Sequence, residues 1–274
     1  MNLTFAADSS ANLISREDLR IVPMKIITDT REFIDDPALD LGQMLSFLSS
    51  YKGRSGTSCP NAGDWLDALE GASESIIVTI TSNLSGAYNS AMQAKQVLEE
   101  NGARVAVLDS LSTGPEMVLI LEKLYQLREL GLSFDETETA ARDYMTHTHL
   151  LFSLASIHNL ARNGRVNPLI AKAIGLLGIR LVGKASDQGT LQPMHKCRGE
   201  KKALQTLWEE MVRMGYQGGK VRIAHCENES GAVELRNTIL AAHPYASVEI
   251  QPCTGLCSFY AEAGGLLVGF EDMV

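Results

Sequence analysis

The chain has 274 residues, of which 45% are hydrophobic, and it carries a formal net charge of -9. This length and hydrophobic fraction are sufficient for one large core or two smaller ones. The negative charge argues against a nucleic-acid-binding protein, which needs a basic face, and against attachment to an anionic bilayer; the longest basic run is the pair Lys201 and Lys202.

The first half of the chain alternates short apolar runs with helical patterns. The runs predict strands at residues 3–7, 21–27, 76–80 and 105–108, and the patterns predict helices at residues 41–48, 60–70, 85–101, 115–130 and 134–145. Strands that alternate with helices of this length are typical of parallel βαβ units. We therefore expect a Rossmann-like parallel α/β domain over residues 1–148.

The second half has a different pattern. Two runs, 179–184 and 191–196, flank Ser186-Asp187-Gln188-Gly189, which is a typical hairpin turn. Further strands are expected at residues 150–155, 221–224, 247–250 and 266–270, and helices at residues 200–214 and 231–242. This mixture predicts a second, mixed α/β domain over residues 149–274.

Two further features concern location and redox state. No signal-peptide pattern opens the sequence, and the longest apolar run, residues 169–183, contains Lys172 and Arg180 and falls short of the roughly 20 uninterrupted residues that span a bilayer. The five cysteines are odd in number and form no C-x-x-C motif. We expect a cytoplasmic protein with free thiols, in which Cys253 and Cys257 are buried side chains; metal ligation by this pair is the alternative.

Polar residues follow the ends of four predicted parallel strands. In open α/β sheets, ligands bind outside these carboxyl ends. Hydroxyl groups there donate hydrogen bonds without filling the crevice, and helix N-termini add unpaired N–H groups. The pattern predicts an anion site; the alternative for each group is a helix cap or a turn. The four groups are Asp8-Ser9-Ser10, Thr28-Asp29-Thr30, Thr81-Ser82 and Asp109-Ser110.

The segment after the predicted strand 76–80 favours ligand binding over capping alone. Gly86 leaves the backbone open to the close approach of a ligand. Thr57 and Ser58, in the glycine-flanked stretch "GRSGTS", supply additional hydroxyl groups. We expect Thr57, Ser58, Ser85 and Gly86 to hold the anion.

The sequence around Ser85 lacks the glycines of the G-x-S-x-G nucleophile motif, and no particular histidine is indicated as its base. The chain also lacks a phosphate-binding loop and a dinucleotide fingerprint. We therefore predict a site that holds an anion without transforming it, with no catalytic residue, no metal and no cofactor. The alternative is a hydrolase or transferase that acts on a small anionic substrate through Ser85 or Cys257.

The stretch "PLIAKAIGLLGIRLVG", residues 168–183, is apolar almost all round, with small residues interspersed. It predicts one wall of an apolar channel, to which Ile170, Ala173, Ile174 and Leu177 would contribute; the alternative is a buried helix and strand. An anion site beside an apolar wall suits an amphiphile with a carboxylate head.

Six segments of the chain, in order, resemble motifs of the DegV family of bacterial fatty-acid-binding proteins. The resemblance extends from residue 3 to about residue 215, with weaker agreement beyond, and its most specific part is "ITSNLSGAYNSA". The other five segments are "FAADSSANL", "GTSCPNAGDWLDAL", "VLDSLSTGPE", "LASIHNLARNGRV" and "LVGKASDQGTLQPMHKCRGEKKAL".

The resemblance implies a two-domain α/β protein with a long-chain fatty acid held between the domains. It implies that Thr57 and Ser85 bind the carboxylate. It also implies that the protein presents the fatty acid to a separate fatty acid kinase for phospholipid synthesis, and that it carries no nucleotide of its own.

Two arginines, Arg165 and Arg198, match positions that the family keeps as arginine. We expect them in loops at the domain edge, where they would affect a partner or the entrance and not the carboxylate site. A third hypothesis is a protein-interaction module in which these two residues join Arg162, Lys201 and Lys202 in one docking face.

The chain also departs from the family pattern. Many members end in an H-x-G-P-G segment whose histidine lies near the head group, and here Cys257 or Ser258 is expected near that position. Asn163 replaces the first glycine of the family's G-G-R motif.

Overall fold

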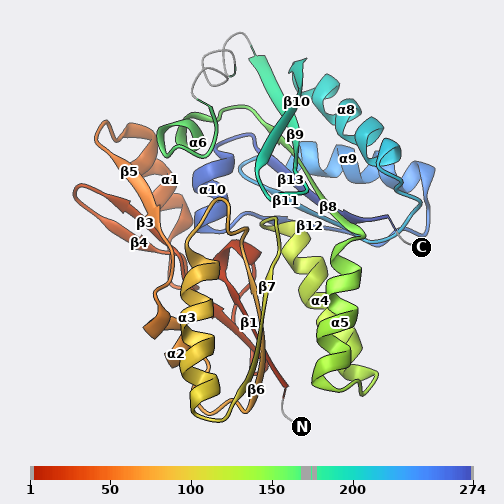
Figure 1. The fold of residues 1–274 in the computed structure, drawn as a ribbon. Coiled ribbons are helices and arrows are strands. Elements are labelled where there is room, and N and C mark those ends of the chain that lie inside the picture. Colours follow the sequence, from red (N-terminus) through yellow and green to blue (C-terminus); the bar gives the residue numbers. More distant parts are fainter. Residues whose placement is uncertain (1–2, 168–173, 175–177, 273–274) are drawn as a thin grey trace.

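The structure is a computed structural model that describes residues 3–167, 174 and 178–272. It contains a four-stranded sheet, a six-stranded sheet and a small three-stranded sheet, with helices between and around them (Figure 1). No helix among the described residues is long and apolar enough to cross a membrane.

The first sheet is parallel throughout, as predicted. Its strand order is β2-β1-β6-β7, with β1 at Leu3–Asp8, β2 at Leu19–Val22, β6 at Glu74–Thr79 and β7 at Arg104–Asp109. Helices α2 (Ala62–Ala68) and α3 (Ala87–Glu100) cover one face, and α4 (Pro115–Glu129) and α5 (Phe134–Met145) pack on the other.

The prediction of one strand over residues 21–27 is wrong. Pro23, which has no backbone N–H to donate, separates β2 from β3 (Lys25–Thr28). Strand β3 pairs on both sides in an antiparallel sheet, with β4 (Glu32–Ile34) and with β5 (Ser55–Ser58). Helix α1 (Leu41–Ser50) packs on this sheet through Met44. The last four residues of the glycine-flanked stretch "GRSGTS" therefore form an edge strand.

The second large sheet is mixed. Its order is β10-β9-β8-β13-β11-β12, and only β11 and β12 run parallel among its pairs. The expected hairpin is confirmed, because the Gly189 N–H donates to Ser186 O at 2.7 Å between β9 and β10. The strands are β8 (Thr148–Leu154), β9 (Ile179–Ala185), β10 (Leu191–Arg198), β11 (Val221–His225), β12 (Val248–Pro252) and β13 (Leu266–Glu271).

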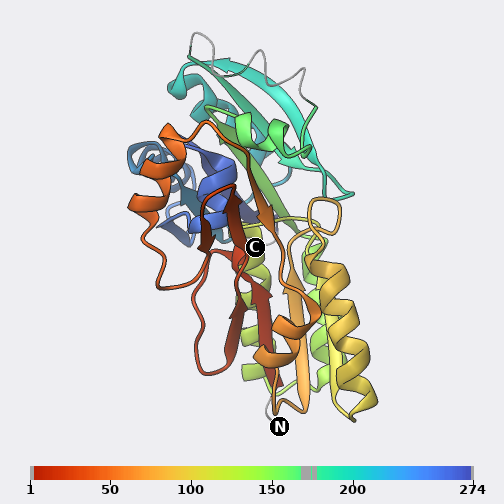
Figure 2. The same ribbon diagram turned by 90° about the vertical axis from the view of Figure 1, so that its left-hand side faces the viewer.

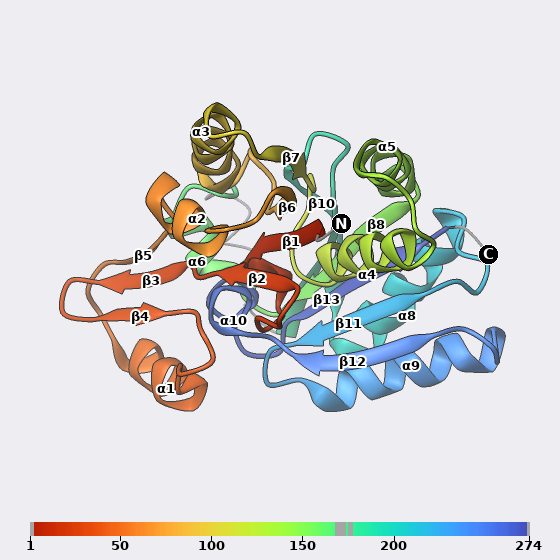
Figure 3. The same cartoon turned by 90° about the horizontal axis from the view of Figure 1, so that it is seen from below.

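Helices α8 (Glu200–Arg213) and α9 (Glu229–Ala242) cover the outer face of this mixed sheet. Helix α4 lies between the two large sheets, as the view in Figure 3 shows. It approaches β13 so closely that a Cβ atom at Gly269 would lie 2.5 Å from the backbone of Pro115. Two short helices, α6 (His158–Arg162) and α10 (Gly255–Ala261), were not predicted; α10 packs against the strand ends of the first part.

The two large sheets lie one above the other, with the N-terminus at the end away from the second sheet (Figure 2). The chain enters the second sheet at Thr148, where β8 begins. The division into domains at 1–148 and 149–274 stays a prediction, since α4 packs on both sheets.

Candidate functional site

A cavity of about 300 Å³ lies where the strand ends of the first sheet, strand β5 and the inner face of the second large sheet meet. This volume is within the range of small-molecule sites in proteins. Both parts of the chain contribute to its wall. The lining residues are Met24, Thr57, Ser58, Cys59, Ile80, Leu84, Ser85, Gly86, Thr113, Leu150, Phe152, Leu154, Leu160, Arg165, Leu191, Leu256, Cys257, Tyr260, Ala261 and Leu267.

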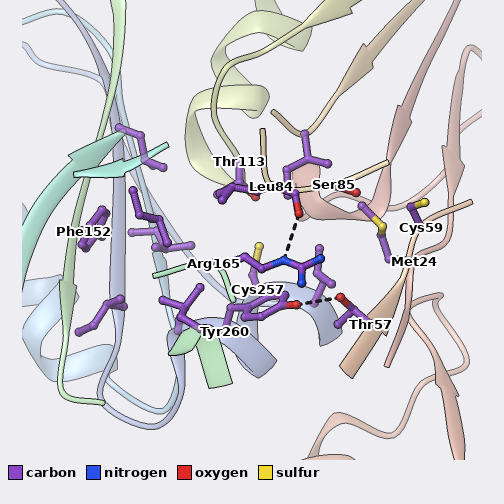
Figure 4. A pocket seen from close by; sticks show the side chains of 18 of the residues that line it. Met24, Thr57, Cys59, Leu84, Ser85, Thr113, Phe152, Arg165, Cys257 and Tyr260 are labelled. Carbon is purple, nitrogen blue, oxygen red and sulfur yellow. Dashed lines mark hydrogen bonds between the residues drawn. The ribbon is translucent and has the colours of Figure 1, made fainter. Parts of the chain in front are cut away.

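The hydroxyl groups of this cavity face an apolar wall. They come from β5, the loop after β6, Thr113 and Tyr260, and apolar side chains such as Met24 and Leu84 lie among them, whereas β8 contributes only apolar side chains. Figure 4 shows Phe152 on the wall across from Thr57 and Ser85, with Arg165 extending between the two walls. One cavity therefore offers hydrogen-bond donors at one end and a hydrocarbon surface at the other.

Ser85 lies in the loop that joins β6 to α3. Its hydroxyl oxygen accepts a hydrogen bond from the Ala87 N–H at 3.3 Å, which satisfies one of the free N–H groups at the start of α3. A serine hydroxyl has one hydrogen as well as two acceptor sites. Ser85 can thus accept this bond just before Gly86, the N-cap of α3, and still donate its hydrogen to a ligand.

Thr57 lies in β5 and is paired in register with Ile26 of β3. Its Oγ1 lies 2.8 Å from the phenol oxygen of Tyr260, which belongs to α10. Burial raises the pKa of the Tyr260 hydroxyl, so the phenol stays neutral at physiological pH and keeps its proton. One hydroxyl donates its hydrogen to the other in this contact, so the pair keeps one hydrogen that it can donate to a ligand.

Gly86 and Ser58 complete the wall beside these hydroxyls. A Cβ atom at Gly86 would lie 3.1 Å from the sulfur of Cys59, so the glycine allows β5 and the start of α3 to approach closely. The Ser58 hydroxyl donates to Cys59 O at 3.3 Å. Its hydrogen is therefore engaged within the protein.

Arg165 follows the turn that ends α6. Gly164 has a φ of 72°, and the Arg165 N–H donates back to Leu160 O at 2.8 Å, which turns the chain toward the cavity. The guanidinium Nε donates to Leu84 O at 3.2 Å, and the group also donates to Asn163 O. A half-buried cation thus lies beside the hydroxyl groups.

Two buried carboxyl groups hold the elements that carry these side chains. Asp8 accepts from the Ile80 N–H at 2.8 Å and also bonds the hydroxyl of Ser10; burial raises the pKa of Asp8 to about 6. Asp35 accepts from the N–H groups of Gly255 at 2.6 Å and Leu256 at 3.0 Å, and burial raises its pKa as well. Asp35 thereby fixes α10, and with it Tyr260, to the first part of the chain.

The hairpin between β9 and β10 contacts the loop between β6 and α3, which carries Ser85. The Asn83 side-chain amide donates to Gln188 O at 2.5 Å. A Cβ atom at Gly189, whose φ is 70°, would lie 2.1 Å from Thr81 Oγ1. The loop that carries Ser85 is therefore packed by both parts of the chain.

Neither candidate nucleophile has the surroundings that its chemistry requires. The Cys257 thiol donates to Ser10 O at 3.4 Å, and burial raises its pKa far above neutrality, so it is held as the unreactive thiol. The Ser85 hydroxyl has the Ala87 N–H as its partner, and among the described residues no histidine or carboxylate bonds it. The same residues contain no group of three or more histidine, cysteine or acidic side chains that could hold a metal ion.

The sequence matches the model of the family described as "Uncharacterised protein, DegV family" over residues 6–271. The chain belongs to the DegV family. A DegV domain-containing protein of Streptococcus pneumoniae is 44% identical over 252 residues, which cover 91% of this chain and 90% of that one. Another from Streptococcus pyogenes serotype M1 is 42% identical over 279 residues, which cover 99% of this chain and 100% of that one.

Two solved structures of DegV proteins are similar over the whole fold. One is a DegV family protein from Eubacterium eligens loaded with heptadecanoic acid, with a TM-score of 0.96, 44% identity and coverage of 99% of this chain and 100% of that one. The other is the Streptococcus pneumoniae Fatty Acid Kinase (Fak) B3 protein loaded with linoleic acid, with a TM-score of 0.97, 41% identity and coverage of 100% of both chains. The α/β fold class predicted for this DegV chain is confirmed.

The residues predicted for the site fall into three groups in this DegV structure. Thr57, Ser58, Ser85 and Gly86 all line the cavity. Ile174 is buried among residues of β8 and β9, whereas Ile170, Ala173 and Leu177 lie outside the described residues. Arg198 is exposed at the end of β10 and does not line the cavity.

Arg165 was expected at the domain edge, but the turn after α6 directs it into the cavity wall; its role in partner docking stays a prediction. Of the two residues expected at the position of the family's histidine, Cys257 lines the cavity, while Ser258 is buried and donates to Cys253 O at 3.2 Å. Sequence reasoning missed Tyr260, although it is the residue of that segment that bonds Thr57. The one signal in the sequence was that Tyr260 lies in the segment where this chain differs from the family's H-x-G-P-G motif.

Proposed function

We propose that this DegV chain binds a long-chain fatty acid, with the carboxylate at Thr57 and Ser85 and the acyl chain along the apolar wall. The observation that carries the proposal is the division of one cavity into a hydroxyl side and an apolar side. Ser58 and Gly86 flank the two hydroxyls. The heptadecanoic acid and linoleic acid in the two similar DegV structures support this class of ligand.

The energetics of such a site follow from its two sides. Each hydrogen bond to a charged acceptor contributes about 1.5–3 kcal/mol. Each methylene group buried contributes roughly 0.8 kcal/mol before ordering costs. The acyl chain therefore supplies most of the affinity, and Thr57, Ser85, Tyr260 and the Arg165 guanidinium fix the orientation of the carboxylate.

The chain itself is a carrier and not the catalyst. It has neither a phosphate-binding loop nor an activated nucleophile among the described residues. We infer that it presents the acid to a separate fatty acid kinase in the cytoplasm, in the way that the name of the Fak B3 protein suggests for that relative. Arg198, exposed at the end of β10, is the residue proposed to dock the kinase.

The domain division at residue 148 belongs to the same proposal, with the acid held between residues 1–148 and 149–274. Ile174 is buried in the same apolar cluster as Leu154 and Leu160 but does not itself line the cavity, so its tunnel role stays a prediction. The same role for Ile170, Ala173 and Leu177 stays a prediction.

The test is direct. The chain is purified from bacteria and extracted under denaturing conditions, and the extract is analysed by mass spectrometry for a long-chain acid. The delipidated protein is then titrated with palmitate. Ser85→Ala should weaken binding about tenfold, equivalent to about 1.4 kcal/mol, and Thr57→Ala combined with Ser85→Ala should weaken it further.

Ser82→Ala is the matched control, because Ser82 lies in the same loop but does not line the cavity. If Ser85 only caps α3, its replacement should cost about 1 kcal/mol of unfolding free energy and leave palmitate binding unchanged. That result, or an extract without any long-chain acid together with turnover of a small anionic substrate, would contradict the proposal.

A further inference from the structure

The apolar wall of the cavity is built on one face of strand β8. Alternate residues of a strand point to opposite faces of its sheet. Leu150, Phe152 and Leu154 line the cavity, whereas Leu151 packs in the outer core with residues of α8. Phe152 is the one aromatic side chain on this wall, and it is 2% exposed.

Phe152 has a glycine as its cross-strand neighbour. In the antiparallel pair of β8 and β9, Phe152 is in register with Gly183. Side chains of directly opposed residues lie on the same face of a sheet. A side chain at position 183 would therefore project into the cavity beside the ring.

The ring occupies the space that this side chain would take. A Cβ atom at Gly183 would lie 2.5 Å from Phe152 Cζ and 2.7 Å from Cε2, and also 2.5 Å from Gln192 O. Real Cβ atoms do not approach other atoms so closely. Gly183 has no positive φ, so the glycine is required here for space and not for backbone conformation.

The neighbour on the other side of Phe152 is not a glycine. Leu267 of β13 is in register with Phe152 and also lines the cavity. Because the ring leans over β9, the space above β8 and β13 stays part of the cavity. A ring displaced from Gly183 would fill that space.

We propose that the contact between Phe152 and Gly183 sets the length of acyl chain that the cavity accepts. The inference rests on the proposed function, since it assigns the limit of the same fatty acid site. Phe152 lies across the cavity from Thr57 and Ser85 (Figure 4), which places the ring against the distal part of a chain whose carboxylate is held at those hydroxyls.

The experiment compares saturated acids of 12 to 20 carbons by competition titration on the delipidated full chain. Phe152→Leu should raise the affinity for the 20-carbon acid relative to the 16-carbon acid about fourfold, since the freed space admits roughly one additional buried methylene. Gly183→Ala should shift the preference toward shorter acids. The double variant with Phe152→Leu should regain part of the lost length, because the ring no longer opposes the new methyl group and only the contact with Gln192 O remains.

Leu151→Ala is the matched control, because it removes a fully buried side chain from the same strand on the opposite face. It should lower stability and leave the ratio between the two acids unchanged. If Gly183→Ala fails to fold, Phe152→Leu alone carries the test. If the wild type binds both acids and Phe152→Leu has the same ratio of affinities for the 20-carbon and 16-carbon acids, the inference is overturned. If the wild type binds no acid, the proposed function is overturned instead.

Discussion

The hydroxyl oxygens of Thr57 and Tyr260 lie 2.8 Å apart, although 203 residues separate them in the chain. Thr57 belongs to an edge strand of the small sheet and Tyr260 to a helix that Asp35 fixes by its N-terminal N–H groups. The hydroxyl pair therefore forms only when the first and last parts of the chain have packed together.

Removal of the phenol oxygen should weaken fatty acid binding and leave the fold intact. In Tyr260→Phe the ring keeps its edge contact with Phe259, but Thr57 loses its partner. We expect about tenfold weaker palmitate binding. Tyr125→Phe is the control, because that phenol also has a side-chain partner, Asp18, but lies outside the cavity. Equal affinity in Tyr260→Phe and wild type would exclude the phenol from the carboxylate site.

The charge of Arg165 should contribute to binding, and that of Arg198 should not. Arg165→Gln removes a half-buried cation beside the hydroxyl groups, so we expect at least about a tenfold loss in palmitate affinity and a weaker dependence on salt. Arg198→Gln should leave the titration unchanged and lower acyl phosphate formation when a fatty acid kinase is added. If Arg165→Gln binds palmitate as the wild type does, Arg165 does not contribute to binding, and the prediction that it docks a partner is favoured.

The ionisation of Asp8 should lower stability as the pH rises. The folded chain holds its proton up to a pKa of about 6, whereas the unfolded chain releases it near 3.8. Between these values the folded state binds more protons, so this group destabilises the fold progressively as pH increases. From pH 3.5 to pH 7 the wild type should lose about 3 kcal/mol of unfolding free energy relative to Asp8→Asn. Chemical denaturation at each pH measures the free energy of unfolding of both proteins. If the two free energies change with pH in the same way, Asp8 is ionised in the folded protein above about pH 4.

The two cysteines of the cavity should differ in reactivity. Cys59 is partly exposed, whereas Cys257 is buried and its pKa is raised by burial. Iodoacetamide should therefore modify Cys59 at least about tenfold faster than Cys257 in the native chain. Saturation with palmitate should protect Cys59, and peptide mapping by mass spectrometry reads both sites in one experiment. Cys59 labelling that ignores palmitate would place the acid elsewhere.

Much of this architecture could be predicted from local patterns. The apolar runs that alternate with helices predict the parallel sheet, and the turn sequence Ser186-Asp187-Gln188-Gly189 predicts the hairpin of β9 and β10. Ser85 and Gly86 were identified because a buried strand, a hydroxyl and a glycine follow one another directly in the sequence. These signals depend on neighbours within a few residues.

Other parts depend on contacts that the sequence does not encode locally. Strand β5 has the sequence Ser-Gly-Thr-Ser, with one β-branched residue and no apolar alternation, and it is a strand because β3 offers it a free edge. Tyr260 becomes a site residue through Thr57 and Asp35, both far away in the chain. Arg165 enters the cavity because of a single turn at Gly164.

The position of α4 between the two large sheets has a thermodynamic consequence. Because Pro115 touches β13 at Gly269 while the rest of the helix packs on the first sheet, the walls of the cavity share one buried support. The distance between the walls is then fixed by the core before the acid binds. The heat-capacity change of binding should accordingly be negative and proportional to the number of methylenes buried, without the larger contribution that accompanies folding upon binding.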